Sequence, residues 1–268
     1  MPELPEVETV KRQISSLQGA VITEAKLLWH NTCPSLPADI FSKTLQNRTL
    51  RNFRRRGKYL IIDLDGLYLI SHFRMTGTFI LAMAADEAPP HARAVFKLSN
   101  GSILYFNDPR KFGRILVCEN EEQVLENLGV EPFDETFTPP FLQKMCAGSR
   151  KPIKSLLLEQ HNVCGIGNMY ADEALFLSGI LPQTSAGVLS ETQCLRLHDA
   201  IINALQSGID HQGATISDYK MPDGSKGRAQ DYFYVAHRLN KPCKNCSSTI
   251  RRTVIGGRGT YYCAYCQS

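Results

Sequence analysis

The 268-residue sequence lacks a long apolar run, a low-complexity tract and an internal repeat. Its most apolar stretch, from Tyr59 to Phe73, is interrupted by Asp63 and Asp65. A membrane span needs about 20 predominantly apolar residues, so this stretch does not qualify. The opening residues, MPELPEVETVKRQ, lack the apolar segment of a secretory signal. These absences argue against a membrane protein or a secreted protein, and we expect the chain in the cytoplasm.

The excess of positive over negative charge is also small. The 30 Lys and Arg residues face 26 Asp and Glu residues, which leaves a formal net charge of +4 and excludes a strongly basic chain. The cations are nevertheless concentrated: Arg51–Lys58 carries five in eight residues, and Lys220–Ser268 carries nine against two aspartates. Such clusters can neutralise nucleic-acid phosphates, and they can equally be solvated surface. Charge alone leaves both interpretations open.

The nine cysteines are an odd number, and disulfides are rare in cytosolic proteins. Five of them are scattered in apolar surroundings, where we expect buried small side chains: Cys33, Cys118, Cys146, Cys164 and Cys194. The other four form two CxxC pairs separated by sixteen residues. Four thiolates at this spacing can close a tetrahedral site with no open position, so we expect one structural and non-catalytic Zn²⁺, bound by Cys243, Cys246, Cys263 and Cys266.

The stretch between the two CxxC pairs, TIRRTVIGGRGTYY, predicts a β-hairpin that turns at Gly256-Gly257. The terminal module therefore resembles a zinc ribbon and not a helix-bearing finger. Arg258 follows the turn directly. It is either a solvated turn residue or, on a hairpin held by metal, a side chain that can enter a DNA groove.

Hydrophobic periodicity predicts a helix over residues 5–17, with a proline in its first turn. From residue 20 to residue 118 the pattern changes to short β-rich runs. Asp65-Gly66 and Asn100-Gly101 each separate two such runs, and these dipeptides are strong signals for tight hairpins. Many short strands of this kind predict a sandwich or a barrel-like pair of sheets.

The second half of the chain is helical in pattern. EPFDETFTPP at 131–140 has the composition of a linker. Ser190 and Gln193 have the spacing of a capping box, and the polar, glycine-bearing segment 209–231 predicts a mobile loop. Helical spacing recurs over 152–160, 168–177 and 190–207.

The chain begins Met1-Pro2-Glu3, and proline at the second position normally permits removal of the initiator methionine. Removal leaves a secondary α-amine, whose pKa lies near 7.7–8.0 against about 10.4 for lysine. Roughly a tenth of such amines are uncharged at neutral pH, so a terminal proline can serve as a nucleophile. Glu3 is a candidate acid or base beside it. Most proteins with this start have no such role, so these residues alone do not establish catalysis.

Six longer motifs occur in a fixed order over essentially the whole chain. Together they resemble the formamidopyrimidine-DNA glycosylases, the bacterial enzymes for oxidised purines. The motifs are MPELPEVETV at 1–10, GKYLI at 57–61, HFRMTG at 72–77, NDPRKFG at 107–113, GIGNMYADEALF at 165–176 and GGRGTYYC at 256–263.

The resemblance implies an α+β multidomain fold. Its parts are an N-terminal two-layer β-sandwich with flanking helices over 1–130, a linker over 131–140, a helix–two-turn–helix domain with a lesion-capping loop over 141–235, and a zinc ribbon over 236–268. Duplex DNA with an oxidised purine or an abasic site is the implied partner, bound by a monomer in a positive cleft. No organic cofactor is implied.

The resemblance also implies catalytic roles. Pro2 would attack C1′ of the damaged nucleoside, and Glu3 would protonate the sugar ring oxygen. Lys58 would contact a phosphate beside the lesion and assist elimination. Arg258 would hold the lesion phosphate and assist the second elimination.

Further residues match family positions that contact DNA. A base becomes reachable only when it leaves the stack. Phe112 would then wedge between base pairs, Arg110 would pair with the orphaned cytosine, and Met75 would fill the hole. The alternative interpretation for Met75 and Phe112 is core packing, but Asp108-Pro109 predicts a turn that would place Arg110 and Phe112 on an exposed loop. The resemblance implies that the DNA backbone is contacted by four further residues, His91, Arg150, Lys154 and Asn168.

Two alternatives stay open. One is an endonuclease VIII-like glycosylase for oxidised pyrimidines, against which Leu4 and the void-filling set argue. The other is a zinc-ribbon DNA-binding protein without catalysis, against which Pro2, Glu3 and Lys58 argue. The sequence departs from the family pattern at Phe73, Ala92-Arg93, Ala236-His237 and either Ser247 or Ser248. None of these positions is the expected nucleophile or a zinc ligand.

Overall fold

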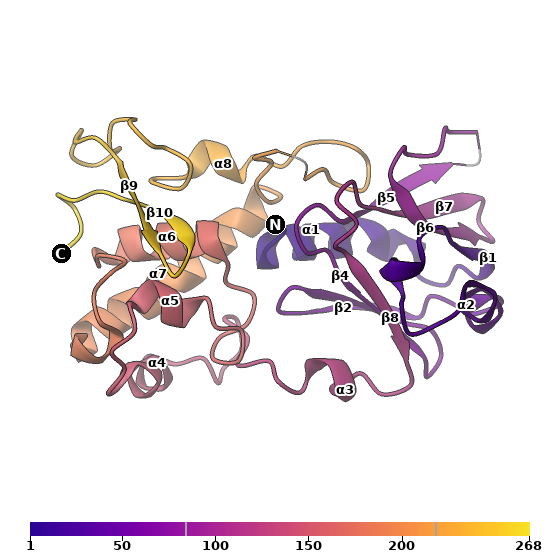
Figure 1. Ribbon diagram of the computed structural model, residues 1–268, viewed down its shortest axis with the longest axis horizontal. Coiled ribbons are helices and arrows are strands. Elements are labelled where there is room, and N and C mark those ends of the chain that lie inside the picture. Colours follow the sequence, from indigo (N-terminus) through magenta and orange to yellow (C-terminus); the bar gives the residue numbers. More distant parts are fainter. Residues whose placement is uncertain (84, 218) are drawn as a thin grey trace. The chain divides into compact units, whose positions relative to one another are not determined.

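The computed structural model describes residues 1–83, 85–217 and 219–268. It divides the chain into two compact units, each described here by itself (Figure 1). Unit 1 consists of Met1–Glu126 and Gln212–Gly227, and unit 2 consists of Asn127–His211 and Arg228–Ser268. The segment 212–227, which the sequence pattern groups with the helical region, therefore belongs to unit 1. Within the described residues, every helix is too short or too polar to span a bilayer.

Unit 1 is a two-layer β-sandwich, as predicted. One sheet has the strand order β1-β6-β7-β5 and the other β2-β3-β4-β8, and all neighbouring strands are antiparallel. The strands are β1 (Ile22–Leu27), β2 (Asn52–Arg56), β3 (Tyr59–Asp63), β4 (Tyr68–His72), β5 (Thr78–Met83), β6 (Ala92–Leu98), β7 (Ser102–Asn107) and β8 (Arg114–Cys118).

Both predicted hairpins of unit 1 are confirmed, with different turns. Asp65 and Gly66 have φ angles of 61° and 77° between β3 and β4, the left-handed pair that a two-residue type I′ turn requires. In the β6–β7 turn, Gly101 alone has a positive φ, of 84°, and its N–H donates to Leu98 O over 3.0 Å. The Asn100-Gly101 dipeptide therefore predicts the hairpin correctly. The loop between β6 and β7 has three residues, however, and not the two of a type I′ turn.

The helices of unit 1 are α1 (Leu4–Ile14), α2 (Ala38–Leu45) and the short α3 (Glu122–Leu125). Helix α1 buries the face predicted from its periodicity, including Val7, Val10 and Ile14, in a core cluster that draws on both sheets. Helix α2 interrupts the region that the sequence pattern describes as strands only. It follows Pro37 and buries Phe41 and Leu45 in the same core.

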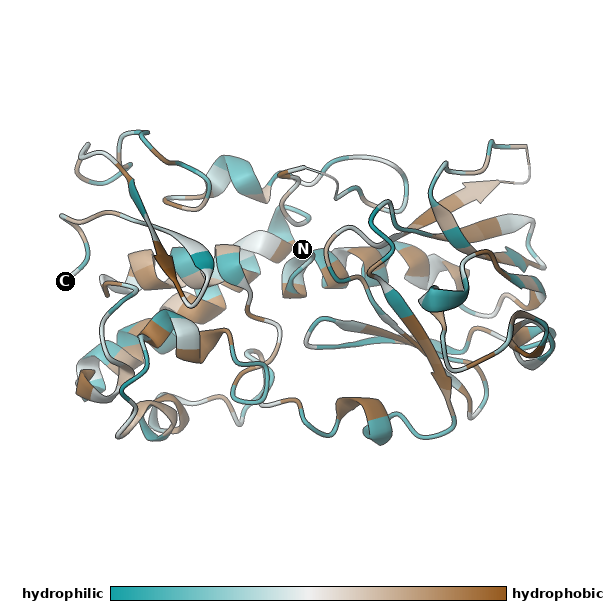
Figure 2. Cartoon of the chain, viewed as in Figure 1, coloured by the Kyte–Doolittle hydropathy of each residue, from teal (hydrophilic) through white to brown (hydrophobic). Residues whose placement is uncertain are grey.

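Unit 2 is helical with a terminal hairpin. Its helices are α4 (Pro139–Cys146), α5 (Ile153–Leu157), α6 (Asn168–Ser178), α7 (Glu191–Asp210) and α8 (Ala229–Tyr232). The predicted capping box opens α7: Gln193 N donates to Ser190 Oγ over 3.2 Å, and Ser190 N donates to Gln193 Oε1 over 2.9 Å. In Figure 2, hydrophilic and hydrophobic residues alternate along α7, as in a helix that buries one face. The hairpin consists of β9 (Arg251–Ile255) and β10 (Arg258–Tyr262).

Candidate functional site

The start of α1 holds the N-terminal residues in fixed positions. Pro2 is buried, and Glu3 is the N-cap of α1 with 2% exposure. Glu3 N donates to Glu6 Oε2 over 2.8 Å, as part of a capping box between the two glutamates. The positive end of the helix therefore lies at Pro2 and Glu3. Met1 precedes them on the surface, with 38% exposure.

Lys58 lies in the turn between β2 and β3, where Arg56 pairs with Tyr59. Its side chain is 6% exposed. The hairpin is bound to α1 by an ion pair in which Arg55 Nε lies 3.3 Å from Glu8 Oε2. Burial alone would raise the pKa of Glu8, but hydrogen bonds from Lys11 and Arg12 and the positive charges of Lys11 and Arg55 lower it overall. Unit 1 therefore holds the helix of Pro2 and Glu3 and the hairpin of Lys58 together through a stable carboxylate.

The segment 212–227 packs against the same helix. Ala214 N donates to Glu6 Oε1 over 2.7 Å, and Tyr219 OH donates to Glu6 O over 3.4 Å. Met221 is 3% exposed in the core of unit 1, and Leu81 N of β5 donates to Pro222 O over 2.8 Å. The prediction of a mobile loop over 209–231 is corrected at both ends, because α7 continues to Asp210 and α8 begins at Ala229.

Two loops of unit 1 present the predicted void-filling residues on the surface. Met75 lies between β4 and β5 and is 40% exposed, and Phe112 lies between β7 and β8 and is 48% exposed. The Arg110 guanidinium lies 5.0 Å from the centre of the Phe112 ring. The structure therefore excludes core packing for Met75 and Phe112. His91 is exposed as well, directly before β6.

His72 ends β4 beneath the Met75 loop. It is 8% exposed, and its Nδ1 accepts a hydrogen bond from Arg74 N over 3.0 Å. Burial, together with the positive charges of Arg74 and Lys58, lowers its pKa to about 3. His72 is therefore neutral at physiological pH, and its acceptor nitrogen fixes the start of the Met75 loop.

In unit 2, Arg258 and Asn168 lie around one hairpin. Arg258 is exposed and follows the Gly256-Gly257 turn, as predicted from the sequence, with both glycines at positive φ. Asn168 begins α6, and its Nδ2 donates to Gly259 O over 2.9 Å. Arg150 is exposed before α5.

Lys154 differs from the other predicted contacts because its side chain is fully buried. Its Nζ lies 2.7 Å from Asp172 Oδ1, and it donates to Thr260 Oγ1 over 2.8 Å and to Gly259 O over 3.2 Å. Asp172 also accepts a hydrogen bond from Tyr261 N over 3.0 Å. The Lys154 ammonium is thus bound to Asp172, Thr260 and Gly259, and it supports the strand that begins at Arg258.

The four CxxC cysteines come together at the end of unit 2. Their sulfur atoms all lie within 4.8 Å of one another, with 3.8 Å between Cys243 and Cys266 and 3.5 Å between Cys246 and Cys263. A tetrahedron with Zn–S bonds of about 2.3 Å has S···S edges of about 3.8 Å. The cluster therefore fits a closed, structural Zn²⁺ site, which holds the base of the hairpin that carries Arg258.

The structure buries several carboxylates that the sequence does not mark as buried, among them Asp108, Asp172 and Glu173. Glu173, on α6, accepts hydrogen bonds from three consecutive amides, Tyr234 N, Val235 N and Ala236 N, at 2.8–2.9 Å. It fixes the segment that leads into the zinc module. Acidic residues inside an otherwise apolar helix are the sequence signal for a buried carboxylate of this kind. That signal does not show which backbone N–H groups the carboxylate binds.

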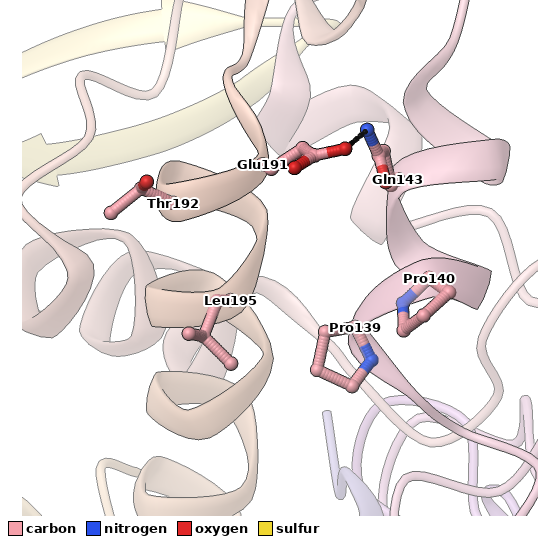
Figure 3. A pocket seen from close by; sticks show the side chains of 6 residues that line it. All are labelled: Pro139, Pro140, Gln143, Glu191, Thr192 and Leu195. Atoms are coloured by element: carbon pink, nitrogen blue, oxygen red, sulfur yellow. Dashed lines mark hydrogen bonds between the residues drawn. The ribbon is translucent and has the colours of Figure 1, made fainter.

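A hollow of about 370 Å³ lies between α4 and α7. Figure 3 shows Pro139, Pro140 and Gln143 on one side and Glu191, Thr192 and Leu195 on the other, with Gln143 Nε2 donating to Glu191 Oε1 over 3.1 Å. None of the predicted site residues lines this hollow.

Three family models match the chain. The N-terminal domain of formamidopyrimidine-DNA glycosylase matches residues 1–115, the H2TH domain of the same enzyme matches 128–220, and a zinc finger found in FPG and IleRS matches 240–268. A formamidopyrimidine-DNA glycosylase of Cytobacillus firmus is 40% identical over 274 residues and aligns over 100% of both chains.

Solved structures of similar fold include two from Lactococcus lactis. The complex of an FPG mutant with DNA containing Fapy-dG has a TM-score of 0.92 and 34% identity, covering 99% of both chains. The complex of Fpg with DNA containing an abasic site has a TM-score of 0.92 and 33% identity, again covering 99% of both chains.

Proposed function

Because the chain belongs to the formamidopyrimidine-DNA glycosylase family, we propose that it excises 8-oxoguanine and formamidopyrimidines from duplex DNA and cleaves the abasic strand by β,δ-elimination. The observation that carries the proposal is the N-terminus of unit 1, where Pro2 and Glu3 lie at the positive end of α1. The relatives with Fapy-dG and abasic DNA support the same substrates.

The reaction needs Met1 to be removed. The lone pair of the Pro2 nitrogen forms a bond to C1′ while the bond from C1′ to the base breaks, and the departing base takes up a proton as the Pro2 nitrogen loses its own. Glu3 then supplies a proton to the sugar ring oxygen as the ring opens. The resulting iminium draws electrons from C2′, so loss of a proton there expels the 3′ phosphate, and a second elimination expels the 5′ phosphate. Water then releases the sugar remnant from Pro2.

The cations have separate tasks. Lys58, on the hairpin joined to α1 through Glu8, stabilises the phosphate beside the lesion. Arg258 holds the lesion phosphate, and Asn168 contacts the same backbone at the N-terminus of α6, where a helix favours anions. His91 and Arg150 also contact the DNA backbone. We reassign Lys154 from backbone contact to support of the Arg258 hairpin, since its ammonium is buried against Asp172.

Met75, Arg110 and Phe112 occupy the space that the extruded base leaves. Met75 and Phe112 are large apolar side chains on the surface, and the Arg110 guanidinium lies over the Phe112 ring. Such exposed apolar groups suit insertion into a base stack better than they suit solvent. The segment 214–231, apart from Asp218, which lies outside the described residues, covers the extruded base. We propose a monomer that acts on the bacterial nucleoid, with functional parts at 1–130, 141–235 and 236–268 and a linker over 131–140. Two details differ from this division, since α4 begins at Pro139 and segment 212–227 belongs to unit 1.

Borohydride trapping tests the proposal. Mature protein and duplex DNA with 8-oxoguanine opposite cytosine should give a covalent complex, and mass spectrometry should place the DNA on Pro2. Pro2→Gly keeps a terminal amine but loses the secondary amine, so its trapping rate should fall. Absence of a trapped complex with mature protein would favour a DNA-binding protein without catalysis, and preference for thymine glycol would favour an endonuclease VIII-like enzyme.

A further inference from the structure

The two loops that carry the void-filling residues have the same place in the sandwich. The first connects β4 to β5 and the second connects β7 to β8, so each passes from one sheet to the other (Figure 1). Their ends are paired on both sides, because His72 lies opposite Arg114 and Thr78 lies opposite Asn107. The loops therefore leave the sandwich side by side at one end.

A buried carboxylate joins these loops. Asp108 is 1% exposed, and its Oδ1 accepts hydrogen bonds from Thr76 Oγ1 and, over 3.2 Å, from Arg110 N. Its Oδ2 accepts from Gly113 N over 2.7 Å. Thr76, 6% exposed on the other loop, accepts from the same Arg110 N over 3.2 Å. The amide of Arg110 is thus held by both members of the Asp108–Thr76 pair.

The backbone of Asp108 extends the network to a third element. Asp108 N donates to His91 O over 2.9 Å, and Asp108 O accepts from Arg93 Nε over 2.8 Å. One buried residue therefore contacts both loops and the segment of His91.

Close packing leaves these loops little room to shift. A Cβ added to Gly113 would lie 2.7 Å from Phe106 Cζ, and one added to Gly77 would lie 2.7 Å from Phe73 O. The rings of Phe73 and Phe106 stack at 6.2 Å beneath the loops. With the core this tight, the loops have one arrangement in which all hydrogen bonds to Asp108 are made.

We infer that Asp108 and Thr76 are positioning residues that set the enzyme's discrimination for the base opposite the lesion. The inference rests on the proposed function, in which Arg110 meets that base. A side chain can discriminate between cytosine and adenine only if its backbone is fixed relative to Met75 and Phe112. The Asp108–Thr76 pair supplies that fixation, although neither residue touches DNA.

Thr76→Val and Thr76→Ser form a matched pair for the test, because valine keeps the shape of threonine without its hydroxyl and serine keeps the hydroxyl. The kcat/KM for 8-oxoguanine excision is measured opposite cytosine and opposite adenine. In Thr76→Val the ratio of the two values should fall about tenfold, as expected for loss of one buried hydrogen bond. In Thr76→Ser it should stay within about twofold of wild type.

A second substrate separates positioning from general damage. A single-stranded oligonucleotide with an abasic site has no opposite base, so Thr76→Val should cleave it like wild type. Two results for Thr76→Val would overturn the inference. One is an equal loss of kcat/KM on the two duplexes and the single-stranded oligonucleotide, and the other is an unchanged ratio of kcat/KM opposite cytosine to kcat/KM opposite adenine. Failure of the wild-type protein to cleave any of them would instead overturn the proposed function.

Hydrogen exchange keeps the inference testable if Thr76→Val proves too unstable for kinetics. In the wild-type protein the amides of Arg110 and Gly113 should be protected despite their place in exposed loops. Asp108→Asn, which keeps the side-chain shape but alters the acceptors, should speed exchange at both amides at least about tenfold. Fast exchange of the Arg110 amide in the wild type would refute the pairing.

Discussion

Replacement of His72 by asparagine should flatten the dependence of stability on pH. In the folded protein, burial and the charges of Arg74 and Lys58 lower the pKa of His72 from 6.5 to about 3. In the unfolded chain the pKa of His72 returns to 6.5. Between these two values the unfolded chain binds a proton that the folded protein excludes, so the stability that neutral His72 contributes is present above pH 6.5 and is lost as the pH falls toward 3.

The magnitude follows from the width of that window. Each pH unit within it removes about 1.36 kcal/mol from the free energy of unfolding. Between pH 6.5 and about pH 4.5, His72 should therefore cost the wild-type protein about 2.7 kcal/mol. Asparagine does not titrate, and its Oδ1 can accept the Arg74 N–H that His72 Nδ1 accepts over 3.0 Å.

Urea unfolding followed by circular dichroism, at several pH values in this window, measures the difference. Carboxylates titrate in both proteins, so only the difference between wild type and His72→Asn reports on His72. The control is His30→Asn, in the same unit but exposed, which should follow the wild-type curve. If the two curves for wild type and His72→Asn differ by less than about 1 kcal/mol at about pH 4.5, the proposed burial of a neutral imidazole is refuted.

Three further predictions follow from the geometry. Removal of zinc by a strong chelator should unfold the hairpin of Arg258 and abolish DNA binding; unchanged affinity in a binding titration of the metal-free protein would contradict a structural metal. Lys154→Met leaves the buried Asp172 carboxylate without its positive partner and should cost about 3–5 kcal/mol in urea unfolding, whereas the double variant Lys154→Met/Asp172→Leu should recover most of that loss. Phe112→Ala should change the free energy of unfolding by less than about 0.5 kcal/mol because the ring is on the surface, but should slow base excision at least about tenfold in single-turnover assays.

The sequence predicts local structure well wherever a physical rule acts over a few residues. Helical spacing identifies the buried face of α1, the Asp65-Gly66 dipeptide identifies a type I′ turn, and Ser190 with Gln193 identifies the start of α7. The CxxC spacing identifies the metal cluster. The exposure of Arg258 beside its turn follows from the same hairpin rule.

Segment 212–227 shows where local rules fail. Its polar and glycine-rich composition predicts a loop without fixed structure, yet Tyr219 and Met221 are buried in unit 1. The partner of Ala214 N is Glu6, 208 residues earlier in the chain. No periodicity within the segment can reveal a partner at that distance, so only the tertiary structure shows that the segment is anchored.

The same limit explains why the sequence predicts exposed residues for the proposed site but not the buried residues that support them. Lys154 looks like a surface cation in the run KPIKSL, but its partners are Asp172 and, 106 residues away, Thr260. Asp108 resembles an ordinary turn residue, and its partner Thr76 lies on another loop, 32 residues earlier. A buried charge is costly unless it is paired, so a buried Lys or Asp beside an exposed Arg258 or Arg110 must be held by groups that fold around it. Arg110 and Arg258, which we propose contact DNA, thus each lie beside a buried charged residue of their own unit. Substitution of Asp108 or Lys154 should therefore alter specificity although neither side chain is on the surface.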